Sequence, residues 1–222
     1  MTMTMERQPD FAAMRTAMVA SQLRTNAVSD ARVVAVMANV PRERFVPAEM
    51  APFAYRDDLI VLGGGRSLNL PIATGRLLTE ARLLPSDHVL LIGAASGYTA
   101  AALGELVASV VAVEVDPALA AQARANLGAS ERITIVEAPL ELGHPERAPY
   151  DVMIVDGAIE QFPEQLVAQV RPGGRIVGGV VDNGVTRLAS GRRSEGGFAM
   201  IDFADVNCCR LPGFAKPARF TF

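Results

Sequence analysis

Apolar residues in the first third of the chain recur at the spacing of an α-helix. The pattern predicts one helix over residues 11–23 and a second over residues 29–40, which Pro41 ends because proline cannot continue a helix. A third helix is predicted over residues 72–81. The stretch from 45 to 71, which contains three consecutive glycines, shows no period and is expected to be irregular.

After residue 84, short apolar runs alternate with helical patterns, which is typical of βαβ units and predicts a parallel sheet with right-handed crossovers. A final pair of runs, separated by two glycines, predicts an antiparallel hairpin at the sheet edge. The expected fold is therefore an α/β three-layer sandwich with a mostly parallel sheet of seven strands. The predicted strands cover 88–92, 110–114, 133–136, 151–155, 175–181, 185–190 and 198–206, and the predicted helices cover 98–107, 117–127 and 162–170.

One domain is expected for the whole chain, residues 1–222. Half of the residues are hydrophobic, which is enough for a single well-buried core. Within that domain we expect a helical N-terminal region with a substrate loop (1–84), a cofactor-binding core (85–206) and a C-terminal tail (207–222).

Charge and hydropathy exclude several classes of protein. The formal net charge is -3 and the basic residues form no cluster, so we expect no nucleic-acid partner. The most apolar stretch, 89–113, is interrupted by Ser96-Gly97 and Glu105, which favours strand, turn, helix and strand over a membrane span. The first ten residues lack the apolar run of a signal peptide, so we expect a cytoplasmic protein without a membrane partner.

Cys208 and Cys209 are adjacent, which disfavours a disulfide between them, and two thiols without histidines nearby do not make a zinc site. No metal is expected. We expect the pair to pack as small apolar residues in a strand, and a role in sensing oxidants stays open.

A glycine-rich turn, Gly93-Ala94-Ala95-Ser96-Gly97, follows the first predicted core strand and precedes a helix. Such a turn lets a ligand approach the backbone, although a plain tight connection looks the same. Glu114 ends the next strand about 20 residues later, where a carboxylate can accept hydrogen bonds from ribose hydroxyls. Turn and acid together indicate a nucleoside cofactor, either a nicotinamide dinucleotide or S-adenosylmethionine.

Several segments resemble the protein-L-isoaspartate O-methyltransferase family, which is a family of class I, Rossmann-like methyltransferases. The resemblance runs from about residue 12 to residue 206, and the run Val-Pro-Arg-Glu-Arg-Phe-Val-Pro is its most specific part. The matching segments are 18–24, 40–47, 54–57, 65–71, 89–98 and 172–175. The resemblance implies methyl transfer from S-adenosylmethionine to the carboxylate of isoaspartyl residues in damaged proteins or peptides. A carboxylate is already a nucleophile, so such a site mainly positions and desolvates the reactants.

The resemblance assigns roles to particular residues. Asn69 stands where the family has its key serine, and Ser67 lies on the same loop, so both are candidate catalytic residues. Asp156 and Gly157, after the fourth core strand, are the candidate substrate residues. The candidate cofactor-binding residues are Gly93, Ala95, Ser96, Gly97, Glu114 and Pro139.

Several of these positions differ from the family pattern. Leu91 replaces an acid that faces the ammonium group of the cofactor, and Ala95 replaces a glycine. Pro139 stands where an aspartate accepts from the adenine, unless Glu137 or Glu141 takes that part. We therefore expect weak binding of S-adenosylmethionine and slow or absent turnover.

Three functions compete at this point. The first is a working isoaspartyl methyltransferase with a remodelled pocket. The second is a catalytically impaired relative that keeps the fold as a binding or assembly module. The third, a nicotinamide-dependent oxidoreductase, is disfavoured because the turn lacks the full Gly-x-Gly-x-x-Gly pattern. Cofactor binding separates the first two, and the oligomeric state is not predicted.

Overall fold

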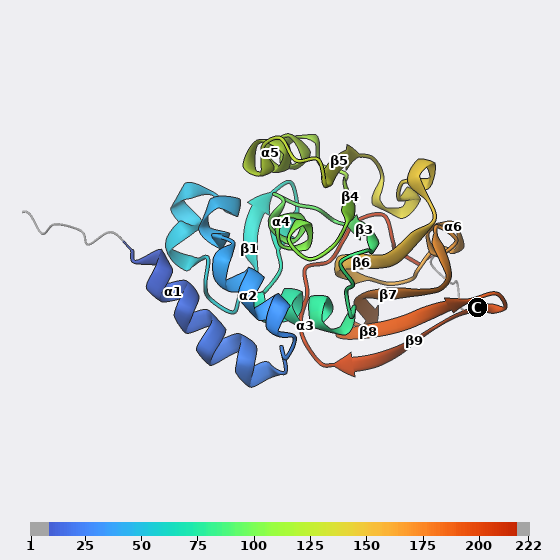
Figure 1. Cartoon of the computed structure of the whole chain (residues 1–222), viewed down its shortest axis with the longest axis horizontal. Coiled ribbons are helices and arrows are strands. Elements are labelled where there is room, and N and C mark those ends of the chain that lie inside the picture. Colours follow the sequence, from blue (N-terminus) through green and yellow to red (C-terminus); the bar gives the residue numbers. More distant parts are fainter. Residues whose placement is uncertain (1–8, 217–222) are drawn as a thin grey trace, which may run out of the picture.

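The computed structural model of the chain describes residues 9–216. The three predicted N-terminal helices are present and lie together at one side of the molecule (Figure 1). The first continues beyond its α-helical part into a π-helical turn, Val19–Leu23, and a 3-10 turn, Arg24–Asn26. The helices are α1 (Phe11–Met18), α2 (Ala31–Asn39) and α3 (Pro71–Glu80).

Aspartates begin the first two helices. Asp10 accepts a hydrogen bond from the Ala13 amide at 2.9 Å, and Asp30 accepts one from the Arg32 amide at 2.8 Å. Each carboxylate accepts a hydrogen bond from an amide that has no partner within its helix. Its negative charge also interacts favourably with the positive end of the helix dipole. The sequence therefore fixes where these helices begin.

The stretch 45–71 is more ordered than we expected. It contains a 3-10 turn, Ala48–Phe53, and a hairpin of two short strands, β1 (Ile60–Gly63) and β2 (Arg66–Leu68). Gly63, Gly64 and Gly65 connect these strands with φ angles of +101°, +57° and +75°, which only glycine adopts without strain. The prediction of an irregular segment is wrong here, because the strands are too short to show a period.

The seven-stranded sheet has the order β5-β4-β3-β6-β7-β8-β9. Strands β3 to β7 pair in parallel, and β8 and β9 are antiparallel to their neighbours, so the predicted α/β fold with an antiparallel C-terminal hairpin is confirmed. The strands are β3 (His88–Ile92), β4 (Ser109–Glu114), β5 (Ile133–Glu137), β6 (Tyr150–Ile159), β7 (Val170–Asp182), β8 (Val185–Ser194) and β9 (Gly197–Ala204).

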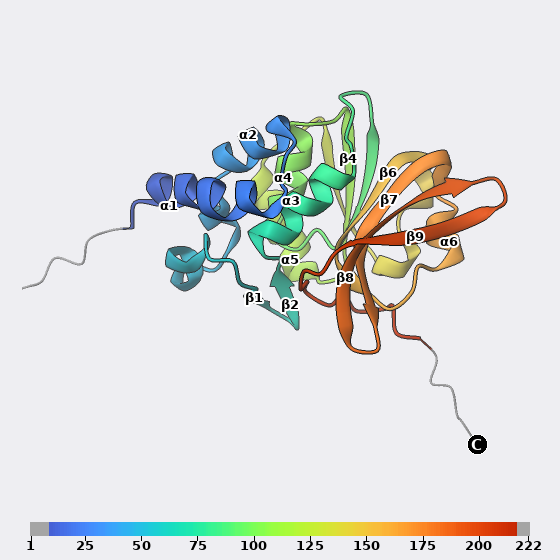
Figure 2. The ribbon, with the colours of Figure 1, turned by 90° about the horizontal axis from the view of Figure 1, so that it is seen from below.

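Helices cover both faces of this sheet (Figure 2). The helices α1, α2 and α3, together with α4 (Tyr98–Gly104), share one hydrophobic cluster with alternate residues of β3. The helix α6 (Glu164–Val167) and the C-terminal segment share a second cluster on the opposite face. The helix α5 (Pro117–Leu127), which lies along β4 and β5, has the bounds that the sequence predicted.

Two core elements differ from the prediction. The helix predicted over 162–170 is only four residues long, because Val170 already pairs with Tyr150 and begins β7. The Pro-Gly-Gly sequence at 172–174 consequently lies inside β7, at an irregularity in its pairing with β6, instead of before the strand. The helix α4 is also shorter than the predicted 98–107.

The C-terminal segment 208–214 packs against the sheet. Its backbone runs beside the end of β6, where the Ala158 amide donates to the Cys209 carbonyl at 2.7 Å and the Leu211 amide donates to the Ala158 carbonyl at 3.0 Å. In Figure 2 this red segment passes along the lower edge of the sheet, near β2. Both cysteines are buried as expected, but they lie outside any strand. We name residues 208–214 the C-terminal strap.

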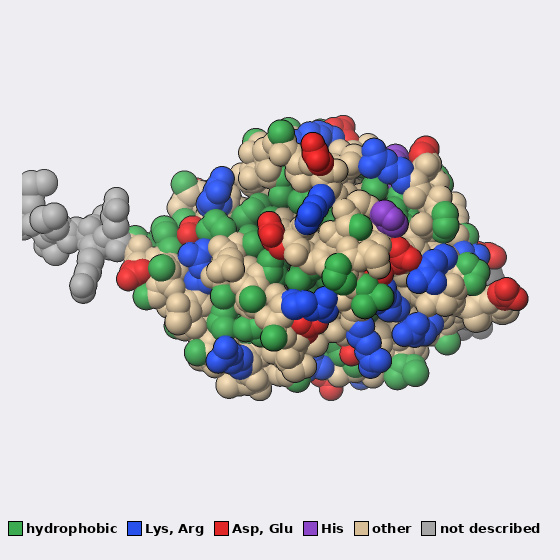
Figure 3. All heavy atoms as spheres, viewed as in Figure 1, with side chains coloured by type: hydrophobic (Ala, Val, Ile, Leu, Met, Phe, Trp, Pro, Cys, Tyr) green, Lys and Arg blue, Asp and Glu red, His purple; other side chains and the backbone are tan. Residues whose placement is uncertain are grey.

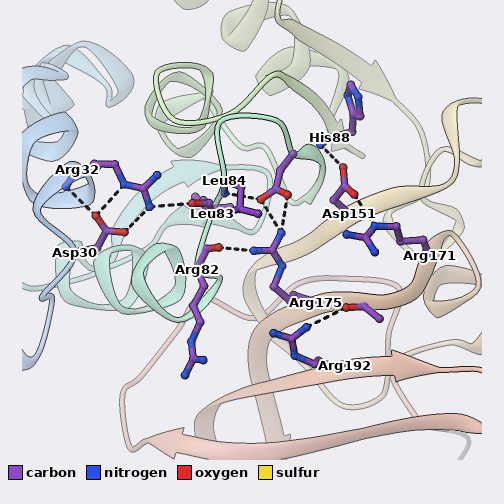
Figure 4. Close-up of polar contacts among 12 residues, drawn as sticks. Asp30, Arg32, Arg82, Leu83, Leu84, His88, Asp151, Arg171, Arg175 and Arg192 are labelled. Carbon is purple, nitrogen blue, oxygen red and sulfur yellow. Dashed lines mark hydrogen bonds and ion pairs between the residues drawn. The ribbon is translucent and has the colours of Figure 1, made fainter.

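Ion pairs join the central strands near their amino ends (Figure 4). Arg175 on β7 donates twice to the buried carboxylate of Asp87, at 2.7 Å each, and Arg171 donates to Asp151 at 2.6 Å. In the space-filling view, basic side chains gather at the lower right, over β7, β8 and β9 (Figure 3). Arg175 thus joins β7 to the loop before β3, and Arg171 joins β7 to β6, both near the amino ends of these strands and away from their carboxyl ends.

Candidate cofactor and substrate site

The turn after β3 has the geometry that its glycines predict. The amides of Gly93 and Ala94 both donate to the Val113 carbonyl, at 3.0 and 2.9 Å, which fixes the turn against β4. Gly93 and Gly97 have φ angles of +86° and +100°. Ala95, at φ +49°, adopts a left-handed conformation that costs a non-glycine residue about 1 kcal/mol. Ala95 therefore adds strain at a position where the family pattern has a glycine.

Glu114 ends β4 directly beside this turn and is fully buried. Its carboxylate accepts the amide of Ala95 at 2.6 Å and the amides of Val115 and Asp116 at 3.0 and 3.2 Å. The turn and the acid that the sequence singled out are thus joined by a direct hydrogen bond. This burial excludes a solvated carboxylate at the end of β4.

Arg66 is the partner of Glu114 that sequence reasoning missed. Its guanidinium reaches from β2 and donates from Nε at 3.1 Å and from Nη2 at 3.0 Å. The two side chains are 2% and 0% exposed, so the pair is shielded from water. Burial lowers the pKa of Arg66, but the bidentate pairing outweighs this and raises the pKa overall. The position of Arg66 on the glycine-rich loop gave no sign of its partner.

A second buried network joins the other candidate residues. Asn69 Nδ2 donates to Asp156 at 2.7 Å, and the Thr99 hydroxyl donates to the same carboxylate at 2.5 Å. Asn69 Oδ1 accepts the amide of Cys209 in the strap at 2.8 Å. Burial is the main reason that the pKa of Asp156 is raised, although these hydrogen bonds and the nearby Arg42 and Arg66 oppose it. Asn69 therefore uses both ends of its amide within the protein.

Arg42 supports this network from below. It is fully buried, donates to the backbone carbonyls of Ala54 and Asn69, and lies over the ring of Tyr98 at 4.9 Å. It comes from the run 40–47 that carries the family resemblance most specifically. That run was therefore a sequence signal that could have identified Arg42. A buried arginine needs several acceptors, and the carbonyls of Ala54 and Asn69 are two of them.

The strap fills the space over the turn. A Cβ atom placed on Gly93 would lie 3.1 Å from the side chain of Leu211 and 3.3 Å from Nη2 of Arg66, and one on Gly157 would lie 2.6 Å from Leu211. Leu211 is itself only 7% exposed. The carboxyl ends of β3 and β6 therefore face side chains of this chain. A hollow of about 860 Å³ lies elsewhere, between α2 and the loop after α4.

The remaining candidates lie around this centre in different environments. The Ser96 hydroxyl donates to the Phe45 carbonyl and is buried. Ser67 is half-buried in β2, where it pairs with Val61 of β1. Pro139 is exposed just after β5, at the start of a 3-10 turn.

Glu137 and Glu141, the two acids that could take the part of an aspartate at the position of Pro139, lie in different places. Glu137 is exposed and stands opposite Glu114 in the pairing of β5 with β4. Glu141 lies against the strap, because a Cβ atom on Gly213 would meet its carboxylate. Leu91 is fully buried in the sheet core, so an acid at this position would need to enter the apolar cluster around it.

The described residues show neither a cluster of metal ligands nor a membrane-spanning helix. Between residues 9 and 216, no group of three or more His, Cys, Asp and Glu side chains is placed to hold a metal ion. Within the same range, no helix combines the length and the apolar character that crossing a bilayer requires.

The sheet order, the glycine turn and the acid at the end of β4 define the fold of class I methyltransferases. A crystal structure of a protein-L-isoaspartate O-methyltransferase superposes with a TM-score of 0.76 at 22% identity and covers 90% of this chain and 66% of its own. A Plasmodium falciparum protein assigned to the same enzyme, in complex with S-adenosyl-L-homocysteine, gives 0.75 at 15% identity over 88% of this chain and 98% of its own.

Sequence comparison identifies the family. The model of the protein-L-isoaspartate(D-aspartate) O-methyltransferase family matches residues 14–209. The enzyme of that name from Methylorubrum extorquens is 38% identical over 204 residues, which is 91% of this chain and 90% of that protein. The one from Koribacter versatilis is 38% identical over 178 residues, or 78% and 80% of the two chains. The chain belongs to the protein-L-isoaspartate O-methyltransferase family, and the expected resemblance is confirmed.

The described conformation does not accommodate the nucleoside cofactor that this family implies. Leu211 and Arg66 occupy the space over Gly93, and Arg66 already takes the carboxylate of Glu114. The polar groups suit a ribose, because an acid at the end of the second parallel strand is where its hydroxyls are held. The polar groups of the site therefore suit the cofactor, but the side chains of Leu211 and Arg66 fill the space that it would occupy.

Proposed function

We propose that this chain is a protein-L-isoaspartate O-methyltransferase that uses S-adenosylmethionine and acts on isoaspartyl residues of damaged proteins and peptides. One observation carries the proposal. The turn 93–97 and Glu114, which the sequence marked independently, meet through the bond from the Ala95 amide, inside a chain matched by the family model over 14–209. The named relatives support the substrate class. We further propose that the chain works as one domain in the cytoplasm.

The proposal divides the site into two parts. Gly93, Ala95, Ser96, Gly97 and Glu114 belong to the cofactor side, with Pro139 at its exposed rim. On the substrate side, the acceptor carboxylate is positioned by Asn69 and Ser67 of the β2 loop and by Asp156-Gly157, which lie within β6 at an irregularity in its pairing with β7. Our reason is that ligands of open α/β sheets bind at the carboxyl ends of the strands, and the turn 93–97 follows β3 there.

We also propose that cofactor affinity is weak. Leu91 and Pro139 supply no carboxylate at their positions, and Asn69 already has partners for both ends of its amide. An unpaired ligand donor in a desolvated site loses about 1–3 kcal/mol, so two such losses weaken binding by about 100-fold or more.

A methyl-transfer assay tests the function. The chain is incubated with S-adenosylmethionine carrying a labelled methyl group and with an isoaspartyl peptide, beside the same peptide with ordinary aspartate as a control. We expect slow labelling of the isoaspartyl peptide and none of the control. Equal labelling of both peptides would contradict the substrate assignment. Absence of labelling together with absence of cofactor binding would favour the binding or assembly module instead.

A further inference from the structure

We propose that Arg66 and the C-terminal strap together form a closure of the cofactor cleft, which must open before a nucleoside can reach Glu114. The inference rests on the proposed use of S-adenosylmethionine and adds to it the control of entry to that site. Opening requires two movements: the guanidinium of Arg66 leaves the Glu114 carboxylate, and Leu211 leaves the backbone at Gly93. Both contacts come from segments that flank the cleft, namely the β1–β2 hairpin and residues 208–214.

The carboxylate of Glu114 has no capacity left for a ribose. It accepts five N–H groups, namely Nε and Nη2 of Arg66 and the three amides of Ala95, Val115 and Asp116. A carboxylate offers about four lone-pair positions. The three amides belong to the turn and to the strand end, so the guanidinium is the group that a ribose must displace.

Arg66 is held in a way that permits this exchange. Among the described residues, its buried Nη1 atom has no hydrogen-bond partner, which makes the closed position less favourable than a fully paired one. The hairpin that carries it turns through three glycines with positive φ angles, at positions 63, 64 and 65. A short two-stranded hairpin with such a turn is an element of low intrinsic stability.

The strap is attached to β6 at few residues. Two backbone hydrogen bonds join it to Ala158, and the Cys209 thiol donates to the Asp156 carbonyl at 3.5 Å. Leu211 and Phe214 are its large buried apolar side chains. Gly213, at φ +90°, lies between these two anchors. A short terminal segment that is joined to the sheet at few residues opens at a lower free energy than global unfolding requires.

Asn69 couples the two parts of the closure. Its Oδ1 accepts the Cys209 amide of the strap, and it follows Arg66 by three residues on the same loop. Release of the strap therefore removes one of the contacts that hold the loop. A ligand that displaces Arg66 from Glu114 is expected to loosen residues 208–211 as well.

The buried thiols of the strap report on its opening. Cys208 and Cys209 are 3% and 4% exposed, and burial raises the pKa of both, that of Cys209 to about 12. A thiol that is buried and protonated reacts slowly with an alkylating reagent. Opening of the strap exposes both sulfur atoms, so the alkylation rate measures how often the strap is open.

The experiment uses the full chain and S-adenosylhomocysteine as the probe. Its dissociation constant is measured by calorimetry for the wild type, for Arg66→Gln and for Leu211→Ala, and thiol alkylation is followed with and without the probe. Arg175→Gln breaks a comparable buried ion pair near the amino ends of β3 and β7, and Leu166→Ala truncates a comparable buried leucine. These two variants are the matched controls for lost stability.

We expect Arg66→Gln and Leu211→Ala to bind S-adenosylhomocysteine at least about tenfold more tightly than the wild type does. The two control variants should bind it as the wild type does. We also expect the probe to accelerate alkylation of the wild type. Unchanged affinity in both variants, with no change in alkylation, overturns the closure but leaves cofactor use intact. If no folded variant binds the probe at millimolar concentration, the proposed use of S-adenosylmethionine is wrong. The proposed closure is then wrong too, because it regulates entry of that cofactor.

Discussion

The side-chain amide of Asn69 lies 2.7 Å from the carboxylate of Asp156, and both groups are buried beneath the C-terminal strap. The two residues are 87 positions apart in the sequence. Asn69 stands where the family has its key serine, and its amide pairs with the carboxylate of Asp156. The substrate side of the site is therefore built around a network that the protein closes on itself, with Thr99 as its third member.

Loss of the Asn69 amide should destabilise the protein. Asn69→Ala leaves the Cys209 amide without its acceptor and Asp156 with one donor fewer, so we expect unfolding to become easier by about 1–3 kcal/mol. Urea denaturation measures this. Asn39→Ala, at an exposed position on α2, is the control and should change the free energy of unfolding by less than about 0.5 kcal/mol. A loss at Asn69 as small as that of the control would show that the network contributes little.

The carboxyl group of Asp156 should make stability fall as the pH rises. Burial raises its pKa above the ordinary value of 3.8, so between 3.8 and the folded pKa the folded chain binds more protons than the unfolded chain. The free energy of unfolding therefore decreases as pH rises through this window. In Asp156→Asn this contribution disappears, and the variant should gain stability relative to the wild type from about pH 4 upward. Urea denaturation at a series of pH values measures the difference.

Asp151 supplies a control of opposite sign. Burial would raise its pKa, but the His88 amide and Arg171 outweigh burial and lower it below 3.8. Its contribution to stability is present above 3.8 and is lost as pH falls through the lowered pKa. Asp151→Asn should therefore lose stability at neutral pH and approach the wild type in acid. The same pH trend in both variants would contradict the assignment for Asp156.

Replacement of Ala95 by glycine should relieve strain in the turn. Ala95 has φ +49°, so Ala95→Gly is expected to stabilise the protein by up to about 1 kcal/mol. Ala94→Gly is the matched control, because Ala94 is the neighbouring residue and is not among those with positive φ. That change should be destabilising by a similar amount through the entropy of the unfolded chain. Thermal unfolding compares the two, and equal effects would show that the turn tolerates alanine without strain.

Cofactor affinity should rise when two family-like residues are restored. Pro139→Asp places a carboxylate at an exposed position, and Ala95→Gly removes a methyl group from the turn, so the double variant should bind S-adenosylhomocysteine about tenfold more tightly. Calorimetry measures the affinity, with Pro139→Asn as the uncharged control. Leu91→Glu is not a suitable addition, because Leu91 is fully buried in the apolar core. Equal affinities of the aspartate and asparagine variants would exclude an adenine contact at residue 139.

Much of the architecture was predictable because its signals are local. The bounds of α5 follow from Pro117 at the first turn and from apolar spacing, and they agree with the prediction. The short hairpin β1–β2 and the short helix α6 were not predicted correctly, since elements of three or four residues carry no measurable period. The antiparallel hairpin at the sheet edge was predictable from two apolar runs around glycines, although each strand proved to have somewhat different bounds.

The sequence by itself determined that a glycine turn follows β3 and that Glu114 ends β4, because strand alternation and turn chemistry are properties of neighbouring residues. It also contained enough motifs similar to those of the family, above all at residues 40–47, to indicate membership of that family. Only the tertiary structure decided which groups these residues meet. Arg66 is 48 residues from Glu114, and Cys209 is 140 residues from Asn69. Contacts over such separations leave no periodic signal, because which donor reaches a buried carboxylate depends on how the loop and the strap fold back over the sheet.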